Sequence, residues 1–444
     1  MRGEVIDLLS WYIRRDFPIL VGGLRDSVQD HLEDIWLPTL VSQYYSEKQD
    51  NFIEFIRSLR EKSFSHLSGR LEEVTSDILG ELLLDQIRYS LKPEVKILGD
   101  LHVATSMRYK QNNEVLFERR PYYDQALAKI IDNFFPELKD SFPAHRHADT
   151  IIYRQFIPVQ IESSNGGQLR QYYYSFGKLS ALLAYLRAID VNAENIIAAL
   201  PSPVLFDLEC LFSPHHPGST KYSFRSTGIV KISDSYDMSA FTGGETPLDS
   251  YLKPLLGGTV LKPQILWKVP SQGKFYNIPQ INGINIHPQS YMKDLINGVN
   301  DAFKVLEKQH AKIKRIIEDN EIGIRIVLRP TREYRLILLQ YYFPHIYEKN
   351  NFEEYLKQEL QGIDYIYAFG EEQSSILHEI KALKKGVIPK FFAEIHSKEV
   401  ITPAGDTAAI LTDTPFDVWN EYTKNLSSIQ KDIITSLREA YPSL

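Results

Sequence analysis

The chain has 444 residues, of which 43% are hydrophobic and 12% aromatic, enough for a sizeable core and two or three domains. Its 50 Lys and Arg against 57 Asp and Glu give a net charge of −7, which argues against a general nucleic-acid-binding protein. The single cysteine, Cys210, excludes an internal disulfide framework and a multi-cysteine zinc site, and its apolar neighbours predict a buried, inert thiol.

No signal peptide opens the chain, and no apolar run approaches the roughly 20 residues that a membrane span needs. We therefore expect a cytoplasmic protein without a membrane span. Residues 1–92 are predicted to form a helical N-terminal region, because apolar side chains recur there at helical spacing. The spacing is clear at Phe52, Phe55, Ile56 and Leu59. This region shows no recognisable chemistry.

The pattern changes to β-structure near residue 94. Residues 94–123 predict a β-hairpin with its turn at 111–113. A helix is predicted over 123–134 and a strand over 151–161, with a turn at the Ser-Ser-Asn-Gly-Gly run that follows. Two histidine pairs are predicted to lie in exposed loops and not to bind metal: His145 and His147, and His215 and His216.

The second half of the chain is predicted to be mainly helical. Residues 213–261 are rich in Ser, Thr, Gly, Pro and His, which is typical of a long loop. From residue 286 to the end we expect helices with one strand over 322–328. The stretches 292–309 and 420–441 are amphipathic and are expected to pack on the core.

The most informative stretch is 171–212, which begins with a buried helix and continues into a polar turn. Asp190 is followed five residues later by Asn195, and a short strand then ends at Asp207. This is the order of a kinase catalytic loop and its metal-binding aspartate. The spacing alone also fits a helix, an Asx turn and an ordinary strand with solvated acids.

Phosphoryl transfer needs these residue types close together. A carboxylate must take or orient the proton of the attacking hydroxyl group, which Asp190 could do. A neutral oxygen and a second carboxylate must hold Mg²⁺ against the phosphates, which Asn195 and Asp207 could do.

Six stretches, in unbroken order, together resemble the dehydratase half of class II lanthipeptide synthetases, the LanM family. They are similar to its GDxH element at 99–102, its helix, TDxHxEN loop and LIDLE strand at 172–212, its LRTG element at 224–228, its DxSG segment at 236–239, its VxFRPT element at 326–331 and its RGDIPYF element at 385–391.

The resemblance implies an α+β, two-lobed fold like that of lipid kinases. It implies a helical N-terminal region at 1–92, a kinase-like N-lobe at 93–170, and a helix-rich C-lobe at 171–444. The C-lobe would contain an activation loop at about 213–261 and the C-terminal helices.

The resemblance also implies an enzyme that uses ATP and Mg²⁺ in two steps. It phosphorylates Ser or Thr of a ribosomally made precursor peptide and then eliminates phosphate to give dehydroalanine or dehydrobutyrine. The family's C-terminal zinc cyclase has no counterpart here, so we expect a stand-alone dehydratase that works with a separate cyclase.

The family's site residues carry over to matching positions. Asp190 orients the hydroxyl group, while Asn195 and Asp207 hold the metal with support from Glu209. The elimination step is assigned to four further residues: Asp100, His102, Arg225 and Thr227. A planar guanidinium group such as that of Arg225 suits a leaving phosphate.

The chain departs from the family at three points. Asn192 replaces the histidine of the catalytic loop, and the glycines that follow GDxH are absent. Glu118 occupies the position of the lysine that pairs with the nucleotide phosphates, so Arg119 or Arg120 is expected to bind ATP instead. These departures keep two alternatives open: an elimination-only lyase working with a separate kinase, and a non-catalytic, pseudokinase-like binding module.

Overall fold

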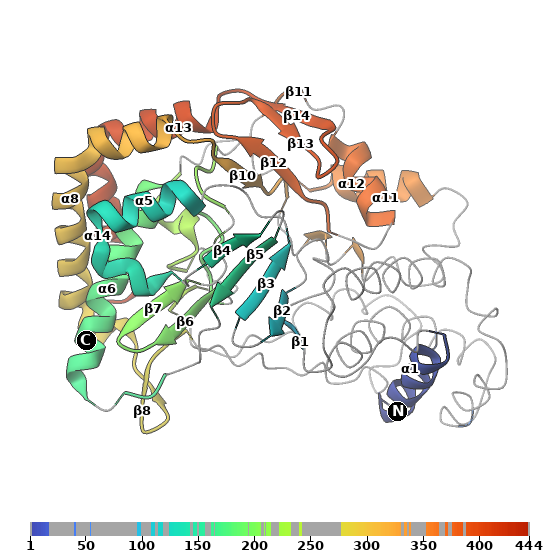
Figure 1. Cartoon of the computed structure of the whole chain (residues 1–444), viewed down its shortest axis with the longest axis horizontal. Coiled ribbons are helices and arrows are strands. Elements are labelled where there is room, and N and C mark those ends of the chain that lie inside the picture. Colours follow the sequence, from blue (N-terminus) through green and yellow to red (C-terminus); the bar gives the residue numbers. More distant parts are fainter. Residues whose placement is uncertain are drawn as a thin grey trace.

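The computed structural model contains two five-stranded antiparallel sheets and a group of long helices (Figure 1). The residues that it describes are 2–16, 40, 54, 96–98, 108–111, 114–118, 124–142, 145–148, 151–155, 161–163, 165–193, 195–205, 208, 210–214, 222–231, 239–241, 277–329, 333–334, 337–338, 352–363, 369–371, 375–384 and 388–442. The chain is therefore a mixed α/β protein, as the sequence predicted. Helix α1 (Arg2–Asp16) is helical as expected, and most of residues 17–92 lie outside the described part.

The first sheet contains the predicted hairpin. Strands β2 and β3 pair with Gln111 opposite Glu114, so the turn falls at the predicted position. All neighbouring strands in this sheet are antiparallel. The strand order is β1 (Lys96–Leu98), β2 (Arg108–Gln111), β3 (Glu114–Glu118), β5 (Ile151–Gln155) and β4 (His145–Ala148).

The assignment of His145 and His147 to a loop is wrong, because both lie in edge strand β4. His145 pairs with Arg154 and His147 with Ile152 of β5. Antiparallel pairing with a β-branched strand therefore outweighed the polar composition of this segment. His215 and His216 lie outside the described residues.

Helix α6 (Gly166–Tyr185) is the centre of the core. The Asn165 side chain caps its N-terminus by accepting hydrogen bonds from the backbone N–H groups of Gly167 and Gln168, at 2.9 and 3.1 Å. The helix therefore begins inside the Gly-Gly pair that the sequence assigned to a turn. Apolar residues from Leu169 to Leu183 are buried, which confirms the predicted buried helix.

Helix α8 (Met292–Glu318) crosses α6 at very close range, and the two run side by side in Figure 1. A Cβ atom on Gly177 would lie 2.0 Å from the carbonyl oxygen of Leu295, and one on Gly298 would lie 2.0 Å from that of Tyr174. Glycine on both helices is thus what lets the two backbones touch.

Helix α5 (Asp124–Phe134), confirmed at its predicted position, packs on the same helical group. So do α13 (Pro415–Tyr422), which was not predicted, and α14 (Leu426–Ala440), which lies within the stretch 420–441 predicted as an amphipathic helix. Trp419 of α13 is fully buried and donates its indole N–H to the carbonyl of Tyr185 at 2.9 Å. The C-terminal helices therefore close over the end of α6.

Strands β6 (Ile196–Ala199) and β7 (Ser202–Leu205) form a small hairpin directly after the Asp190 turn. Val204 and Leu205 are buried, which confirms a buried strand in this stretch. The described strand ends two residues before Asp207.

The expectation of one strand after residue 286 is wrong. Strand β10 (Gly323–Ile326) occupies the predicted position, but it belongs to a second antiparallel sheet. The other strands are short and follow polar turns, so hydrophobic periodicity alone misses them. The order is β10, β12 (Phe391–Glu394), β13 (Glu399–Ile401), β14 (Thr407–Leu411) and β11 (Phe369–Glu371).

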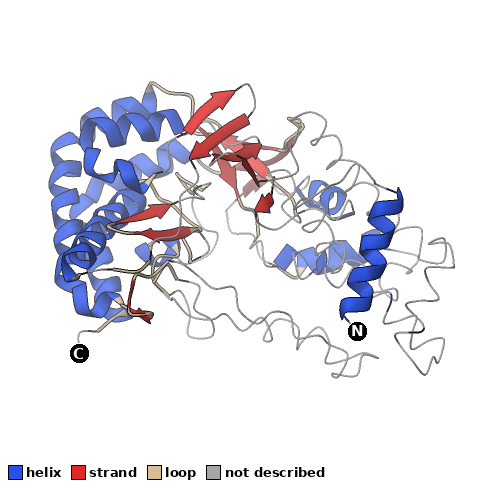
Figure 2. Cartoon of the chain, turned by 60° about the horizontal axis from the view of Figure 1, so that its bottom comes forward, coloured by secondary structure: helices blue, strands red, loops and turns tan. Residues whose placement is uncertain are grey.

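Two further helices and a third hairpin remain to be placed. Helix α11 (Phe352–Gln361) and helix α12 (Ser375–Lys384) lie beside the second sheet in Figures 1 and 2. Strands β8 (Gln280–Ile281) and β9 (Ile284–Asn285) form the hairpin before α8, which begins after the 3₁₀ turn at Pro288–Tyr291.

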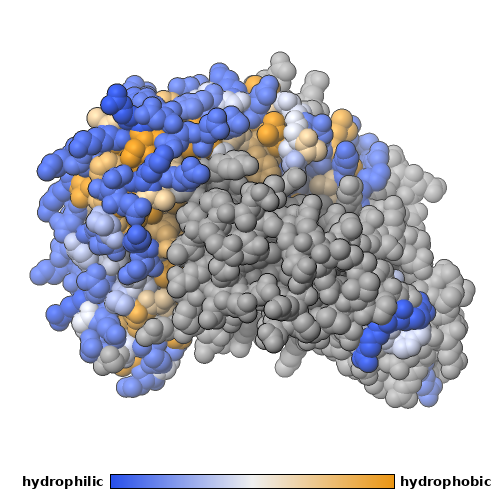
Figure 3. All heavy atoms as spheres, in the orientation of Figure 1, coloured by the Kyte–Doolittle hydropathy of each residue, from blue (hydrophilic) through white to orange (hydrophobic). Residues whose placement is uncertain are grey.

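The described surface is mainly hydrophilic on the face shown in Figure 3, where hydrophobic residues occur in small groups between hydrophilic ones. No helix in the described part of the chain combines the length and apolar character that crossing a membrane requires.

Candidate functional site

The candidate site is the turn that follows helix α6. The helix ends at Tyr185, and the backbone then passes through two left-handed positions, Arg187 at φ 51° and Asp190 at φ 64°. A non-glycine residue in this region costs about 1–2 kcal/mol, although Asp tolerates it better than most residues. Asp190 is exposed and immediately follows buried chain, so its carboxylate is presented to solvent at a fixed place.

Two asparagines hold Asp190 within the turn. Asn192 donates from Nδ2 to Asp190 Oδ1 at 2.9 Å, which orients the carboxylate. Asn195 donates from Nδ2 to the backbone carbonyl of Asp190 at 2.7 Å, which fixes the left-handed backbone. Of the three residues assigned to the metal and hydroxyl group from spacing, the structure therefore brings Asp190 and Asn195 together.

The amide oxygen of Asn195 remains for another partner. Its nitrogen is used by Asp190, and within the described residues its oxygen accepts no hydrogen bond. A neutral amide oxygen beside an aspartate is a suitable ligand for Mg²⁺. The described residues contain no group of three or more His, Cys, Asp and Glu side chains that could hold a metal ion, and Asp207 and Glu209 are not among them.

Backbone hydrogen bonds attach the turn to three distant segments. The N–H of Ile189 donates to the carbonyl of Cys210 at 3.0 Å, and that of Val191 donates to Thr227 at 2.7 Å. Asn192 forms an isolated antiparallel bridge with Ser239. The turn is thus paired through its backbone with Cys210, Thr227 and Ser239. Cys210 itself is buried, as predicted.

A buried arginine within the turn, Arg187, connects it to the segment at 213–214. Arg187 donates from Nε to the carbonyl of Ser213 at 2.7 Å and from a guanidinium nitrogen to that of Pro214 at 3.2 Å. Its guanidinium lies 4.3 Å from the ring centre of Tyr222 and 5.0 Å from that of Tyr422. A cation between two aromatic faces is stabilised electrostatically by both rings.

Tyr222 adds another contact to the same turn. Its hydroxyl donates to the carbonyl of Ala188 at 2.8 Å. Burial is the main reason that the pKa of Tyr222 is raised well above its ordinary value, with Tyr422 adding to the effect. The hydroxyl therefore keeps its proton and remains a donor.

Arg225 and Thr227, assigned to elimination, lie in the short 3₁₀ helix η4 (Phe224–Thr227) beside the turn. Arg225 is partly exposed and pairs with Glu439 of α14 at 3.0 Å, while it also donates to the carbonyl of Lys231 at 2.9 Å. A phosphate group could reach Arg225 only by sharing or displacing the Glu439 carboxylate.

Thr227 is fully buried and is bonded locally. Its hydroxyl donates to the carbonyl of Phe224 at 2.7 Å and accepts from the N–H of Ile229 at 3.1 Å. In this arrangement the side chain stabilises η4, and the backbone carbonyl of Thr227 reaches the Asp190 turn. Its assignment to elimination stays a prediction.

Six assigned residues lie outside the described part of the chain, so their predicted roles stay predictions: Asp100, His102, Arg119, Arg120, Asp207 and Glu209. Two of these residues nevertheless come soon after a described strand in the chain. Strand β3 ends at Glu118, directly before Arg119, and strand β7 ends shortly before Asp207.

Sequence reasoning missed several residues that contact the turn or the segments beside it, Tyr222 among them. Arg187 was not singled out, although an arginine between a buried helix and a conspicuous Asp is a recognisable signal. Asp432, Glu439 and Tyr441 act from more than 200 residues away in sequence, and spacing gives no indication of such contacts.

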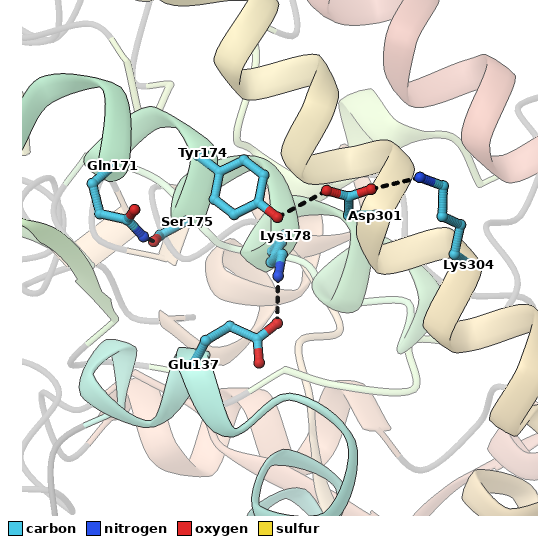
Figure 4. A network of polar contacts seen from close by, with 7 residues as sticks. All are labelled: Glu137, Gln171, Tyr174, Ser175, Lys178, Asp301 and Lys304. Atoms are coloured by element: carbon cyan, nitrogen blue, oxygen red, sulfur yellow. Dashed lines mark hydrogen bonds and ion pairs between the residues drawn. The ribbon is translucent and has the colours of Figure 1, made fainter. Parts of the chain in front are cut away.

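A second polar cluster joins α6, α8 and the turn after α5, and Figure 4 shows its side chains pointing toward one another. Lys178 pairs with Glu137 at 2.5 Å, and Tyr174 donates to Asp301 at 2.9 Å. The hydrogen bond from Lys304 is the main cause that lowers the pKa of Asp301, followed by that from Tyr174. This cluster stabilises the crossing of α6 and α8.

Comparison with known proteins gives two matches. The model of a domain of unknown function, DUF4135, matches residues 117–394, a range that includes Asp190, Asn195 and Arg225. The chain is also 24% identical over 450 residues to a lacticin 481/lactococcin biosynthesis protein, LcnDR2, from Lactococcus lactis subsp. lactis. That match covers 91% of this chain and 47% of the relative, so the chain spans about half of that protein's length. The two matches confirm the family resemblance seen in the ordered motifs.

Proposed function

This chain belongs to the DUF4135 family, and from that membership we propose that it takes part in lanthipeptide maturation as a Ser/Thr dehydratase of a precursor peptide. The observation that carries the proposal is the Asp190 turn, in which an exposed carboxylate is oriented by Asn192 and its backbone is fixed by Asn195. The proposed fold is the two-lobed, lipid-kinase-like one, with the first sheet in the N-lobe and the Asp190 turn in the C-lobe.

In the proposed first step, the hydroxyl oxygen of a peptide Ser or Thr attacks the terminal phosphorus of ATP, and Asp190 accepts the proton of that hydroxyl group. The new P–O bond forms as the bond to ADP breaks. The hydrogen bond from Asn192 orients the carboxylate for this proton transfer.

Asn195 is the described residue best suited to hold Mg²⁺, with Asp207 and Glu209 proposed beside it. When bound, Mg²⁺ supplies positive charge that offsets the charge on the transferring phosphate. Arg119 or Arg120 is proposed to contact the ATP phosphates, because both follow β3 directly and Glu118 cannot do so.

In the proposed second step, a base removes the proton from the α-carbon, the C–O bond to phosphate breaks, and the alkene forms with release of inorganic phosphate. Asp100 and His102 are proposed to handle the proton. Arg225 is proposed to bind the leaving phosphate, for which its partial exposure and its planar guanidinium group make it suitable, with the phosphate taking the place of the Glu439 carboxylate.

The proposal is tested by following the mass of a precursor peptide encoded beside the gene. With Mg-ATP, the wild-type chain is expected to remove water from Ser and Thr, and Asp190→Asn to reduce this by on the order of 100-fold or more. Asp190→Asn is expected still to release phosphate from a synthetic phosphoserine form of the peptide. Unchanged dehydration by Asp190→Asn would disprove the role of Asp190.

Arg225→Lys tests the elimination step. It keeps the charge but loses the planar fork, so phosphate release from the phosphopeptide is expected to fall about 10-fold, while phosphorylation changes little. Arg438→Lys, an exposed change on α14, is the matched control.

A second candidate function is elimination alone, with phosphorylation by a separate kinase. It is favoured by Glu118, which stands where the family has its phosphate-binding lysine. Phosphate release from phosphopeptide without any Mg-ATP-dependent phosphorylation would establish it. Peptide binding with neither reaction would favour the non-catalytic alternative.

A further inference from the structure

Helix α14 is hydrogen-bonded to the start of the segment that holds the Asp190 turn. Asp432 accepts a hydrogen bond through Oδ2 from the backbone N–H of Phe224 at 2.7 Å. Phe224 is the first residue of η4, where backbone N–H groups have no partner within the helix. A charged acceptor at this place makes the bond stronger than a neutral one would be.

The same helix is also bonded to the end of that segment. Tyr441, which directly follows α14, is within 3.1 Å of the hydroxyl of Ser239 through its own hydroxyl, and both residues are buried. The Tyr441 ring packs edge-on against Phe241 with ring centres 5.6 Å apart. The carboxylate of Asp432 thus contacts the start of the 224–241 segment, and the phenol of Tyr441 contacts its end.

Both ends of the 224–241 segment also pair with the Asp190 turn. After Phe224, the carbonyl of Thr227 accepts the N–H of Val191, and Gly228 lies against Val191 so closely that a Cβ atom would approach its carbonyl to 3.3 Å. Ser239 forms the bridge with Asn192. The N–H of Ala240 donates to the carbonyl of Gly228 at 3.2 Å, which joins the two ends.

We propose that helix α14 positions the Asp190 turn, with Asp432 and Tyr441 as positioning residues that act through the 224–241 segment. The proposal rests on the proposed function in treating Asp190 as the hydroxyl-orienting group. Asp190 occupies a left-handed backbone position, and such positions persist only where neighbouring contacts fix them. Two of the contacts of the turn come from the segment that α14 holds.

The test uses the full chain with three changes: Asp432→Ala, Asp432→Asn and Tyr441→Phe. Asp432→Asn keeps an oxygen acceptor for the Phe224 N–H, and Tyr441→Phe keeps the ring against Phe241. The matched controls are Lys431→Gln and Thr435→Val, two exposed changes on α14.

Two measurements are made on each folded variant. The first is kcat and KM for Mg-ATP-dependent phosphorylation of the precursor peptide. Asp432→Ala and Tyr441→Phe are expected to lower kcat by about 10- to 100-fold with little change in KM, because a small displacement of a catalytic group is costly. Asp432→Asn is expected to restore most of the loss, and the controls are expected to behave as wild type.

The second measurement is native-state amide hydrogen exchange of Val191 and Asn192, which does not depend on activity. Exchange there is expected to accelerate at least about 10-fold in Asp432→Ala and Tyr441→Phe, while amides in the middle of α6 are unaffected. If Asp432→Ala does not fold, the Tyr441→Phe result decides.

The outcomes separate this inference from the proposed function. Wild-type kcat and exchange in both variants would overturn the positioning role even if the wild-type chain dehydrates peptides. A raised KM with unchanged kcat would also overturn it, by indicating a peptide contact. If the wild-type chain modifies no peptide, the proposed function fails, and faster exchange at Val191 alone would still support the coupling of α14 to the turn.

Discussion

His310 of α8 is the described residue whose charge state most directly links stability to pH. Its Nδ1 atom lies 2.9 Å from the hydroxyl of Tyr185, and its ring lies near Trp419. Partial burial, and then the positive charge of Lys314, lower the pKa of His310 below its ordinary value of 6.5. The folded protein therefore holds this histidine neutral at pH 7.

From this we predict that stability falls on mild acidification. Above the unfolded pKa of 6.5 the folded and unfolded states bind the same number of protons at this site. As pH falls from 6.5 through the lower folded pKa, the unfolded state takes up a proton first, so stability is lost in that window. Urea unfolding at a series of pH values between about pH 5 and pH 8 measures this loss of unfolding free energy.

His310→Gln is expected to flatten this part of the pH profile, because it removes the titrating group. The matched control is His287→Gln, which changes an exposed histidine outside the helical core. An unchanged slope in His310→Gln would show that other groups cause the loss.

At the residue scale, the sequence was most informative where a local pattern carries chemistry. Asp190 and Asn195 were predicted from a spacing of five residues, and the structure joins them by a hydrogen bond. The pairing of Arg225 with Glu439 could not be predicted, because it depends on how a helix 214 residues later packs.

At the scale of elements, the crossing of α6 and α8 depends on two glycines. We predict that Gly177→Ala and Gly298→Ala each destabilise the protein by about 1–3 kcal/mol or more, since the added carbon would overlap backbone atoms that cannot move alone. The intrinsic helix preference of Ala over Gly, about 1 kcal/mol, would act in the opposite direction. Chemical denaturation measures the difference.

Gly166→Ala is the control on the same helix. A Cβ atom there would have its nearest neighbour at 3.7 Å, in ordinary contact with the Tyr291 hydroxyl. Its stability is expected to stay close to wild type. Comparable losses in all three variants would refute the close crossing.

The elements themselves were predictable to different degrees. The hairpin of β2 and β3, the helix α5 and the long amphipathic helices α8 and α14 have strong periodicity and were found. Strands β12, β13 and β14 were missed because each has three to five residues and their stability comes from pairing, not from a pattern of their own.

For the whole molecule, a buried ion pair connects the end of the β10 segment to helix α12. Arg329 donates from Nε to Glu379 at 2.7 Å, and also donates to the carbonyl of Ile363. Glu379 accepts a further hydrogen bond from the hydroxyl of Tyr334 at 2.5 Å. Arg329 and Glu379 are at most 1% exposed, so neither charge can be hydrated if the other is removed.

We predict that Glu379→Ala destabilises the protein by about 3–5 kcal/mol, because it leaves the Arg329 charge buried without its acid. The double variant Arg329→Met/Glu379→Leu is expected to recover most of that loss, since both charges are then absent. Glu421→Gln, which breaks an exposed pair with Lys424, is the control and is expected to change little. Thermal unfolding of the three variants measures these effects.

The sequence analysis placed Arg329 in the VxFRPT element, directly after the predicted strand over 322–328, and the described strand β10 ends three residues before it. Its partner was beyond prediction, because Glu379, the one acidic residue of helix α12, lies 50 residues later in the chain. The same reasoning explains why the two sheets were only partly foreseen: which strands become neighbours depends on the packing of the whole chain.

The bond between Ser239 and Tyr441 spans 202 residues and connects the turn to nearly the last described position. During synthesis, Asp190 leaves the ribosome roughly 250 residues before that partner, or some 12–50 s earlier at ordinary translation speeds. Throughout that interval the turn lacks one of its anchors. The 224–241 segment can therefore gain this contact only after translation has passed residue 441.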